Sequence, residues 1–154
     1  MISTNEEKGV EELSNGYLLD TDVLIGFLRG RNKALKQEFE RVLHKDIPLF
    51  MSIITLGELY VGAFKSDNTR KNMFLVNSLK DKVEILELNE EIILLYGEIE
   101  AVLEKAGKKI GDFDVLIAST AMNYNLTLMS GNKRHFGKVV NLFGQLDFEQ
   151  WSVN

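Results

Sequence analysis

Short apolar runs alternate with longer amphipathic stretches along the chain from about residue 17 onward. The runs at 17–19, 47–54 and 126–130 are apolar and short, which is typical of buried strands. Residues 83–88 alternate between apolar and polar side chains, as a half-buried strand does. Pro48, the only proline, lies at the start of its run, where a missing N–H is tolerated.

Helical periodicity fills the segments between these runs. Apolar residues recur every three or four positions in 21–30, 33–45, 55–64, 68–82, 89–109 and 112–125. The pattern in 89–109 is the longest, and Gly107 is expected to close that helix. Residues 139–142 are expected to form a last strand. Alternating helices and short strands predict an α/β fold with a central, mostly parallel sheet flanked by helices.

The beginning of the chain differs from the rest. Residues 1–16 are polar and show no period, so we expect a flexible N-terminal arm, 1–16, followed by a single domain, 17–154. No apolar run is long enough to span a bilayer, and no basic and apolar leader opens the chain, so we expect a cytoplasmic protein without a membrane partner.

Composition excludes several classes of chemistry. The chain has no cysteine, which excludes disulfides, thiolate catalysis and cysteine metal sites. The formal net charge of -5 argues against a protein that coats nucleic acid generally. It leaves room for a local basic rim around an acidic centre.

Acidic and amide side chains follow the predicted strands. Parallel strands end at one edge of a sheet, and ligands of open α/β sheets bind beyond that edge. Four segments therefore deliver polar side chains to the same place: Asp20 and Asp22, Glu58, Asp112 and Asp114, and Asn132.

Most of these acids also have a purely structural interpretation. Asp22 and Asp112 are good N-cap residues, and Thr55 to Glu58 fit a capping box. Taken singly, capping is the favoured interpretation of Asp22, Asp112 and Glu58. Asp20 does not fit it, because an unpaired charge at the end of a buried strand is costly.

Taken together, Asp20, Glu58 and Asp114 would concentrate negative charge in one cleft. Like charges raise the pKa of each other and oppose folding, and a divalent cation relieves that conflict. Oxygen ligands, with no cysteine or histidine in the cluster, favour Mg²⁺ or Mn²⁺. Asp22 and Asp112 are additional candidates for contacts with metal or water.

Four segments resemble the signature segments of PIN-domain ribonucleases: LLDTDVLI, SIITLGELYVGA, IGDFDVLIASTA and LTLMSGNKRHFGKV. The chain is most similar to VapC-type toxins of toxin–antitoxin pairs, from about residue 17 to about residue 151. The resemblance implies a PIN-like fold, with Asp20, Glu58 and Asp114 as catalytic, metal-binding acids and Asn132 at the fourth family position. Asp22 stands where many relatives have Asn.

The function implied by the resemblance is Mg²⁺-dependent hydrolysis of RNA phosphodiester bonds by an endoribonuclease. A metal-bound water is the expected nucleophile, because the sequence places no histidine as a base. Lys133, Arg134 and Arg29 are candidates for phosphate contacts, although a lone surface charge is more often simply solvated. The family further implies a homodimer and an inhibitory cognate antitoxin.

Two other functional classes remain open from the sequence. LLDTDV and GDFD look like motifs of haloacid-dehalogenase-type phosphatases, but that family expects Thr where this chain has Leu24, and it has no use for Glu58. The other alternative is a non-enzymatic α/β binding module in which every acid is a cap. A ribonuclease hydrolyses RNA, whereas a phosphatase hydrolyses p-nitrophenyl phosphate. In a non-enzymatic binding module, Asp20→Asn changes stability and nothing else.

Overall fold

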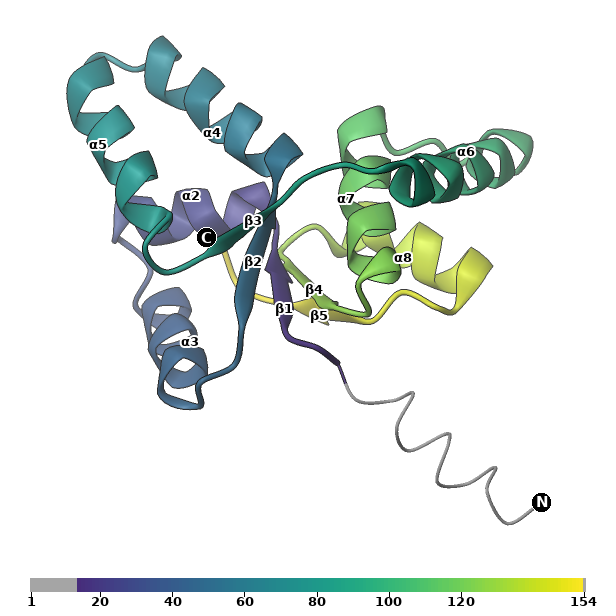
Figure 1. The fold of residues 1–154 in the computed structure, drawn as a ribbon, viewed down its shortest axis with the longest axis horizontal. Helices are drawn as coiled ribbons and strands as arrows, with labels where there is room; N and C mark the ends of the chain where they lie inside the picture. Colours follow the sequence, from purple (N-terminus) through teal and green to yellow (C-terminus); the bar gives the residue numbers. More distant parts are fainter. Residues whose placement is uncertain (1–13, 154) are drawn as a thin grey trace.

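The computed structural model describes residues 14–153 as a parallel sheet with helices on both faces (Figure 1). Every pair of neighbouring strands is parallel, and the strand order is β3-β2-β1-β4-β5. The predicted α/β fold is confirmed, and the described sheet is parallel throughout. The strands are β1 (Tyr17–Leu19), β2 (Leu49–Ser52), β3 (Glu84–Leu86), β4 (Thr127–Ser130) and β5 (Phe148–Gln150).

Seven helices lie within the described residues. Helices α2 to α7 match the six segments in which the sequence predicts helices from apolar periodicity. Helices α4 and α5 pack on each other and extend away from the sheet (Figure 1). The helices are α2 (Thr21–Arg29), α3 (Lys33–His44), α4 (Ile53–Lys65), α5 (Thr69–Leu79), α6 (Glu90–Lys105), α7 (Asp112–Asn123) and α8 (Lys133–Phe143).

The core lies on both faces of the sheet. Successive strand residues point to opposite faces, so Leu19 packs with α2, α3, α4 and α5, whereas Leu18 packs with α6, α7 and α8. Figure 1 shows these two groups of helices on either side of the strands. Burial on both faces explains why the strands are almost continuously apolar in sequence.

Two strand predictions are wrong in extent or position. The apolar run 47–54 leaves the sheet at Ser52, because the Ser52 side chain accepts the Ile54 N–H at 3.1 Å and starts α4. Residues 139–142 lie inside α8, where Phe136 and Val139 are buried one turn apart. The last strand is instead β5, which pairs with β4 at the edge of the sheet.

The strand order creates a switch point at β1. The chain passes from β1 to β2 on one side, and β4 later pairs with β1 on the other side. Open α/β sheets bind ligands at such a point, beyond the carboxyl ends of the strands. The residues that follow β1 and end β4 are Asp20 and Ser130.

The predicted arm is described only at its end. Residues 1–13 lie outside the described residues, whereas the Asn15 N–H donates to the Asn125 carbonyl at 2.9 Å and the Gly16 carbonyl accepts the Thr127 N–H at 2.9 Å. Across residues 14–153, every helix is too short or too polar to cross a membrane.

Candidate active site

Asp20 lies at the carboxyl end of β1 and is the N-cap of α2. Its Oδ1 accepts the Thr21 N–H at 2.8 Å, and its Oδ2 accepts the Ser130 hydroxyl at 2.7 Å. The residue is only 5% exposed. Asp20 is therefore the one candidate acid that caps a helix, although the sequence favoured the other acids for that role.

The capping interpretation is wrong for the remaining acids. Helix α2 is capped by Asp20 and not by Asp22, and α7 follows Gly111, which makes no side-chain cap. Ser52, three residues ahead of Thr55, caps α4, so Glu58 lies beyond the first turn of that helix. Helix capping therefore does not explain why Asp22, Glu58 and Asp112 are acidic.

Asp22 lies beside Asp20 and contacts the end of β4. Its Oδ2 accepts the Gly131 N–H at 3.0 Å, and its Oδ1 lies 3.4 Å from the Ser130 hydroxyl. A Cβ at Gly131 would lie 3.0 Å from Asp22 Oδ2 and 2.5 Å from Val153, so glycine permits this close approach. The acidic pair is therefore held by backbone and hydroxyl donors.

Burial and charge together raise the pKa of the acidic pair. Burial is the main reason that the pKa of Asp20 rises to about 7, and the neighbouring Asp22 and the more distant Asp114 raise it further. Hydrogen bonds from Ser130 and Thr21 oppose that rise. Burial also raises the pKa of Asp22. The fold holds more negative charge at this point than its own donors offset.

Glu58 reaches the same region through Thr21. The Thr21 hydroxyl donates to Glu58 Oε1 at 2.6 Å and lies 3.2 Å from the hydroxyl of the buried Thr55. This contact joins the first turn of α2 to α4. The second carboxylate oxygen of Glu58, Oε2, is not used in it.

His135 contacts an acid of the site, whereas the sequence suggested it only as a phosphate contact beside Asn132. Its Nδ1 lies 2.6 Å from Asp114 Oδ2, so the expectation of a cluster without histidine is wrong. Asn132 caps α8 by accepting the His135 N–H at 3.2 Å, and its amide nitrogen lies 2.9 Å from His135 Nδ1. The only sequence signal was the three-residue spacing from this cap to His135.

The remaining candidates lie at the periphery. Asp112 Oδ1 accepts the Tyr96 hydroxyl at 3.0 Å on an exposed surface, away from the Asp20 carboxylate contacts. Lys133 and Arg134 are exposed in the first turn of α8, and Arg29 is exposed at the end of α2. Among residues 14–153, no three acidic or imidazole side chains are already arranged as a metal site.

Comparison with known proteins identifies the family. Residues 17–142 match the PIN domain. The chain belongs to the PIN-domain family. Ribonuclease VapC1 of Haemophilus influenzae (strain R2866) is 35% identical to this PIN-domain protein over 126 residues, 82% of the chain and 93% of the relative. The tRNA(fMet)-specific endonuclease VapC of Shigella flexneri is 28% identical over 136 residues, 88% of the chain and 98% of the relative.

Solved structures confirm the PIN-like fold. VapBC2 from Rickettsia felis, bound to a DNA fragment from its promoter, aligns with a TM-score of 0.79 at 29% identity, covering 88% of this chain and 98% of that one. VapBC-1 from nontypeable Haemophilus influenzae aligns with a TM-score of 0.76 at 32% identity, covering 88% and 97%. These relatives do not favour the phosphatase interpretation of this PIN-domain protein.

The raised pKa of Asp20 predicts a pH-dependent stability. Because the folded pKa lies above the unfolded one, the folded state binds more protons between about pH 4 and 7, and the free energy of unfolding falls as the pH rises. Metal-free wild type should therefore melt at a lower temperature at pH 8 than at pH 5. Asp20→Asn should flatten this dependence and raise the free energy of unfolding at pH 8 relative to metal-free wild type.

Thermal melts in EDTA from pH 5 to 8 measure this effect. Asp67→Asn is the matched control, because Asp67 is exposed between α4 and α5. An Asp20→Asn variant with the same pH slope as wild type and as the Asp67→Asn control would contradict the assignment of the raised pKa to Asp20.

Proposed function

We propose that this PIN-domain protein is an Mg²⁺-dependent endoribonuclease, with Mn²⁺ as an alternative metal, that hydrolyses RNA phosphodiester bonds. The observation that carries the proposal is the pair of buried Asp20 and half-buried Asp22 at the switch point of the sheet, with the pKa of Asp20 raised to about 7. The names of the relatives, ribonuclease VapC1 and tRNA(fMet)-specific endonuclease VapC, support it. We further propose that the protein is the toxin of a VapBC-type pair and acts in the cytoplasm.

The residues present fit a hard divalent cation. Carboxylate oxygens are the donors that Mg²⁺ prefers, and excess buried negative charge is what a cation offsets. Asp20, Glu58 and Asp114 would hold the metal, directly or through water, and Asp22 would add a further contact. Asp112 is left out of the proposed ligand set, because its carboxylate accepts the Tyr96 hydroxyl on an exposed surface.

Two of the proposed ligands already have an orienting partner. Thr21 engages Oε1 of Glu58 and leaves Oε2, and His135 engages Oδ2 of Asp114 and leaves Oδ1. Ligating carboxylates usually carry such a second hydrogen bond, which fixes the direction of the ligating oxygen. Thr21 and His135 thus have the position of residues that orient Glu58 and Asp114 without blocking both oxygens.

The proposed reaction divides between metal and protein. When bound, the metal supplies Lewis acidity that activates water and offsets charge on the phosphodiester. The Asn132 side chain, fixed as the cap of α8, orients a water or a phosphate oxygen. Exposed Lys133, Arg134 and Arg29 attract neighbouring phosphates, which offsets the charge of the acids for an anionic substrate.

Neutralising the acids tests the proposed activity. Asp20→Asn, Glu58→Gln and Asp114→Asn should each lower Mg²⁺-dependent RNA cleavage by more than about a hundredfold, and Asn132→Ala should lower it by about tenfold, since an orienting residue contributes less than a ligand. Asp112→Asn is the matched control and should cleave like wild type. Gel analysis of RNA fragments gives the rates, and circular dichroism checks the fold.

Two results would count against this assignment. Loss of cleavage in Asp112→Asn with wild-type cleavage in Asp114→Asn would show that the wrong acid of the α7 motif was chosen. Hydrolysis of p-nitrophenyl phosphate without RNA cleavage would favour the phosphatase alternative.

Metal binding should stabilise the folded protein. At a hundredfold excess over the dissociation constant, a metal that binds only the folded state adds about 2.7 kcal/mol to the free energy of unfolding. For a domain of this size that gain raises Tm by roughly 5–10 °C. Melts with EDTA and with excess Mg²⁺ measure it, and NaCl at matched ionic strength is the control. Asp20→Asn should lose most of the shift, and a wild-type melt indifferent to Mg²⁺ and Mn²⁺ would oppose the metal site.

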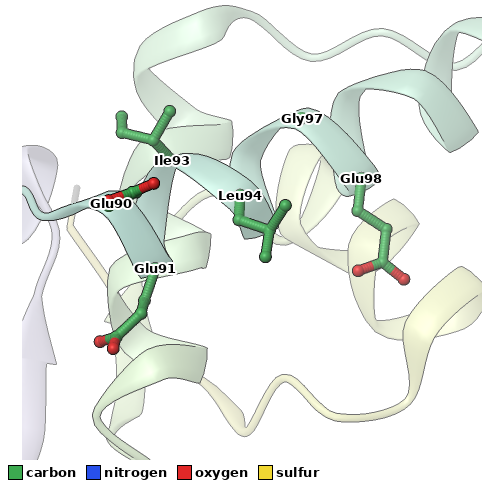
Figure 2. Close-up of a pocket in the computed structure, with 6 residues that line it drawn as sticks. All are labelled: Glu90, Glu91, Ile93, Leu94, Gly97 and Glu98. Atoms are coloured by element: carbon green, nitrogen blue, oxygen red, sulfur yellow. The ribbon is translucent and has the colours of Figure 1, made fainter.

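Two exposed apolar surfaces support partners for the proposed toxin. The α4 surface consists of Val61 and Phe64, 55% and 69% exposed and one turn apart. The α6 surface consists of Ile93 and Leu94, 46% and 75% exposed. Figure 2 shows Leu94 between Glu91 and Glu98 and Ile93 beside Glu90, and these residues line a cavity of about 800 Å³. Exposed apolar patches of this kind mark interaction sites.

We propose that these surfaces serve two partners, a second copy of the chain and a cognate antitoxin. The neighbouring solved structures are named as VapBC complexes, which supports the antitoxin. Exposed large apolar side chains are costly in water, and two partners would cover two separate surfaces.

Co-expression with the small reading frame beside the gene should therefore relieve growth arrest caused by the toxin.

Introducing a charge on each surface separates the partners. Phe64→Glu and Leu94→Glu should each abolish one association, homodimer formation or antitoxin binding, because burying an unpaired carboxylate is costly. Light scattering after size-exclusion chromatography gives the mass of the toxin alone and with the antitoxin. A wild-type monomer, or both variants behaving as wild type in both assays, would refute this assignment of the surfaces.

A further inference from the structure

We propose that a cavity beside Asp22 is a subsite for one nucleotide of the RNA, adjacent to the cleaved bond, with Arg29 and Arg31 holding its phosphate. This inference rests on the proposed ribonuclease function and adds a place where the substrate strand is held. The cavity has a volume of about 490 Å³, within the range of pockets that enclose small organic ligands. Its lining comes from α2, from the loop after α2 and from the C-terminal segment: Asp22, Ile25, Gly26, Arg29, Arg31 and Val153.

The C-terminal wall of the cavity is held by two hydrogen bonds. The Trp151 N–H donates to the Ser130 carbonyl at 3.0 Å, and the Trp151 residue is only 4% exposed. Asn32, which also lines the cavity, donates from Nδ2 to the Ser152 carbonyl at 3.1 Å. Val153 therefore directly follows two residues that are hydrogen-bonded to β4 and to the start of α3, and the cavity is a built part of the fold.

The charged part of the cavity suits a phosphate. Arg29 and Arg31 are exposed, and neither forms a salt bridge within residues 14–153. A guanidinium binds a phosphate through two parallel N–H donors, which a carboxylate partner would otherwise occupy. Two such groups beside one cavity attract an anion even though the chain as a whole has a net charge of -5.

The other part of the cavity is apolar. Ile25 and Val153 supply side chains, and Gly26 supplies bare backbone, because a Cβ there would lie 2.6 Å from Leu35 Cδ2. Apolar pocket walls bury the apolar surface of small organic ligands, and the flat faces of a base are such a surface. A nucleotide, anionic at the phosphate and flat at the base, matches both parts of the cavity.

Asp22 connects the cavity to the acidic site. Its carboxylate accepts the Gly131 N–H and lies beside Asp20, and the same residue lines the cavity. A nucleotide in the cavity is thus next to the phosphodiester presented to Asp20. Arg31 binds and positions the strand from this subsite, and it takes no part in breaking the bond.

Binding of a short RNA tests the subsite without any need for cleavage. The probe is a fluorescently labelled six-nucleotide RNA, measured by anisotropy with the Asp20→Asn protein in EDTA. Adding Arg31→Ala should weaken binding about tenfold, the effect of losing one charge-assisted contact. The slope of log K against log salt should fall by about 0.7, as for one phosphate contact on a single strand.

The matched control is Arg70→Ala, which removes the same charge from an exposed position on α5. This variant should change both quantities little, within about twofold for affinity. In the protein with Asp20 intact, Arg31→Ala should raise KM about tenfold and leave kcat within about twofold, because it removes binding and not bond breaking.

The outcomes separate this inference from the proposed function. If wild type fails to cleave RNA while Arg31→Ala weakens RNA binding and Arg70→Ala does not, the ribonuclease function fails and an RNA-binding site at Arg31 stands without it. If wild type cleaves RNA while Arg31→Ala and Arg70→Ala bind alike, the subsite is overturned. Weaker antitoxin binding by Arg31→Ala with unchanged RNA binding assigns the cavity to the protein partner and also overturns the subsite.

Discussion

The buried carboxyl of Asp20 is the constraint on which the rest of the site depends. It joins the end of β1 to the start of α2 through the Thr21 N–H and to the end of β4 through the Ser130 hydroxyl. One side chain therefore caps α2 and also carries the buried charge of the site, because Asp20 lies beside Asp22. An Asn at this position keeps a capping oxygen and loses the charge, so the two roles are separable by experiment.

The architecture follows from the sequence to a large extent because periodicity reports burial. Helix and strand types were predictable for nearly all segments, and so was the edge at which the acids gather. The errors arise where tertiary structure overrides a local pattern: Ser52 ends an apolar run by capping α4, and Val139 is buried in a helix although its neighbours suggest a strand. Capping was assigned to Asp22 and Glu58 because spacing alone does not reveal which oxygen reaches an N–H.

The sequence predicts a set of acids for the site but not the contacts that those acids make. The contact between His135 and Asp114 joins the start of α8 to α7, and the contact between Thr21 and Glu58 joins α2 to α4. These pairs depend on how the helices pack on each other, and the pattern of residues within one segment does not reveal that packing. The same is true of the cavity at Arg31, whose wall comes from the other end of the chain. Resemblance supplies the acids, and the fold supplies their orientation.

The hydrogen bond between Asp20 and Ser130 joins residues that are 110 positions apart. During synthesis the first acids leave the ribosome long before the strand that completes their surroundings, since chains grow at about 5–20 residues per second. A nascent chain that stops before β4 has Asp20 and Asp22 but not the donors of Ser130 and Gly131. The order of the strands therefore delays assembly of the acidic site until most of the chain has been made.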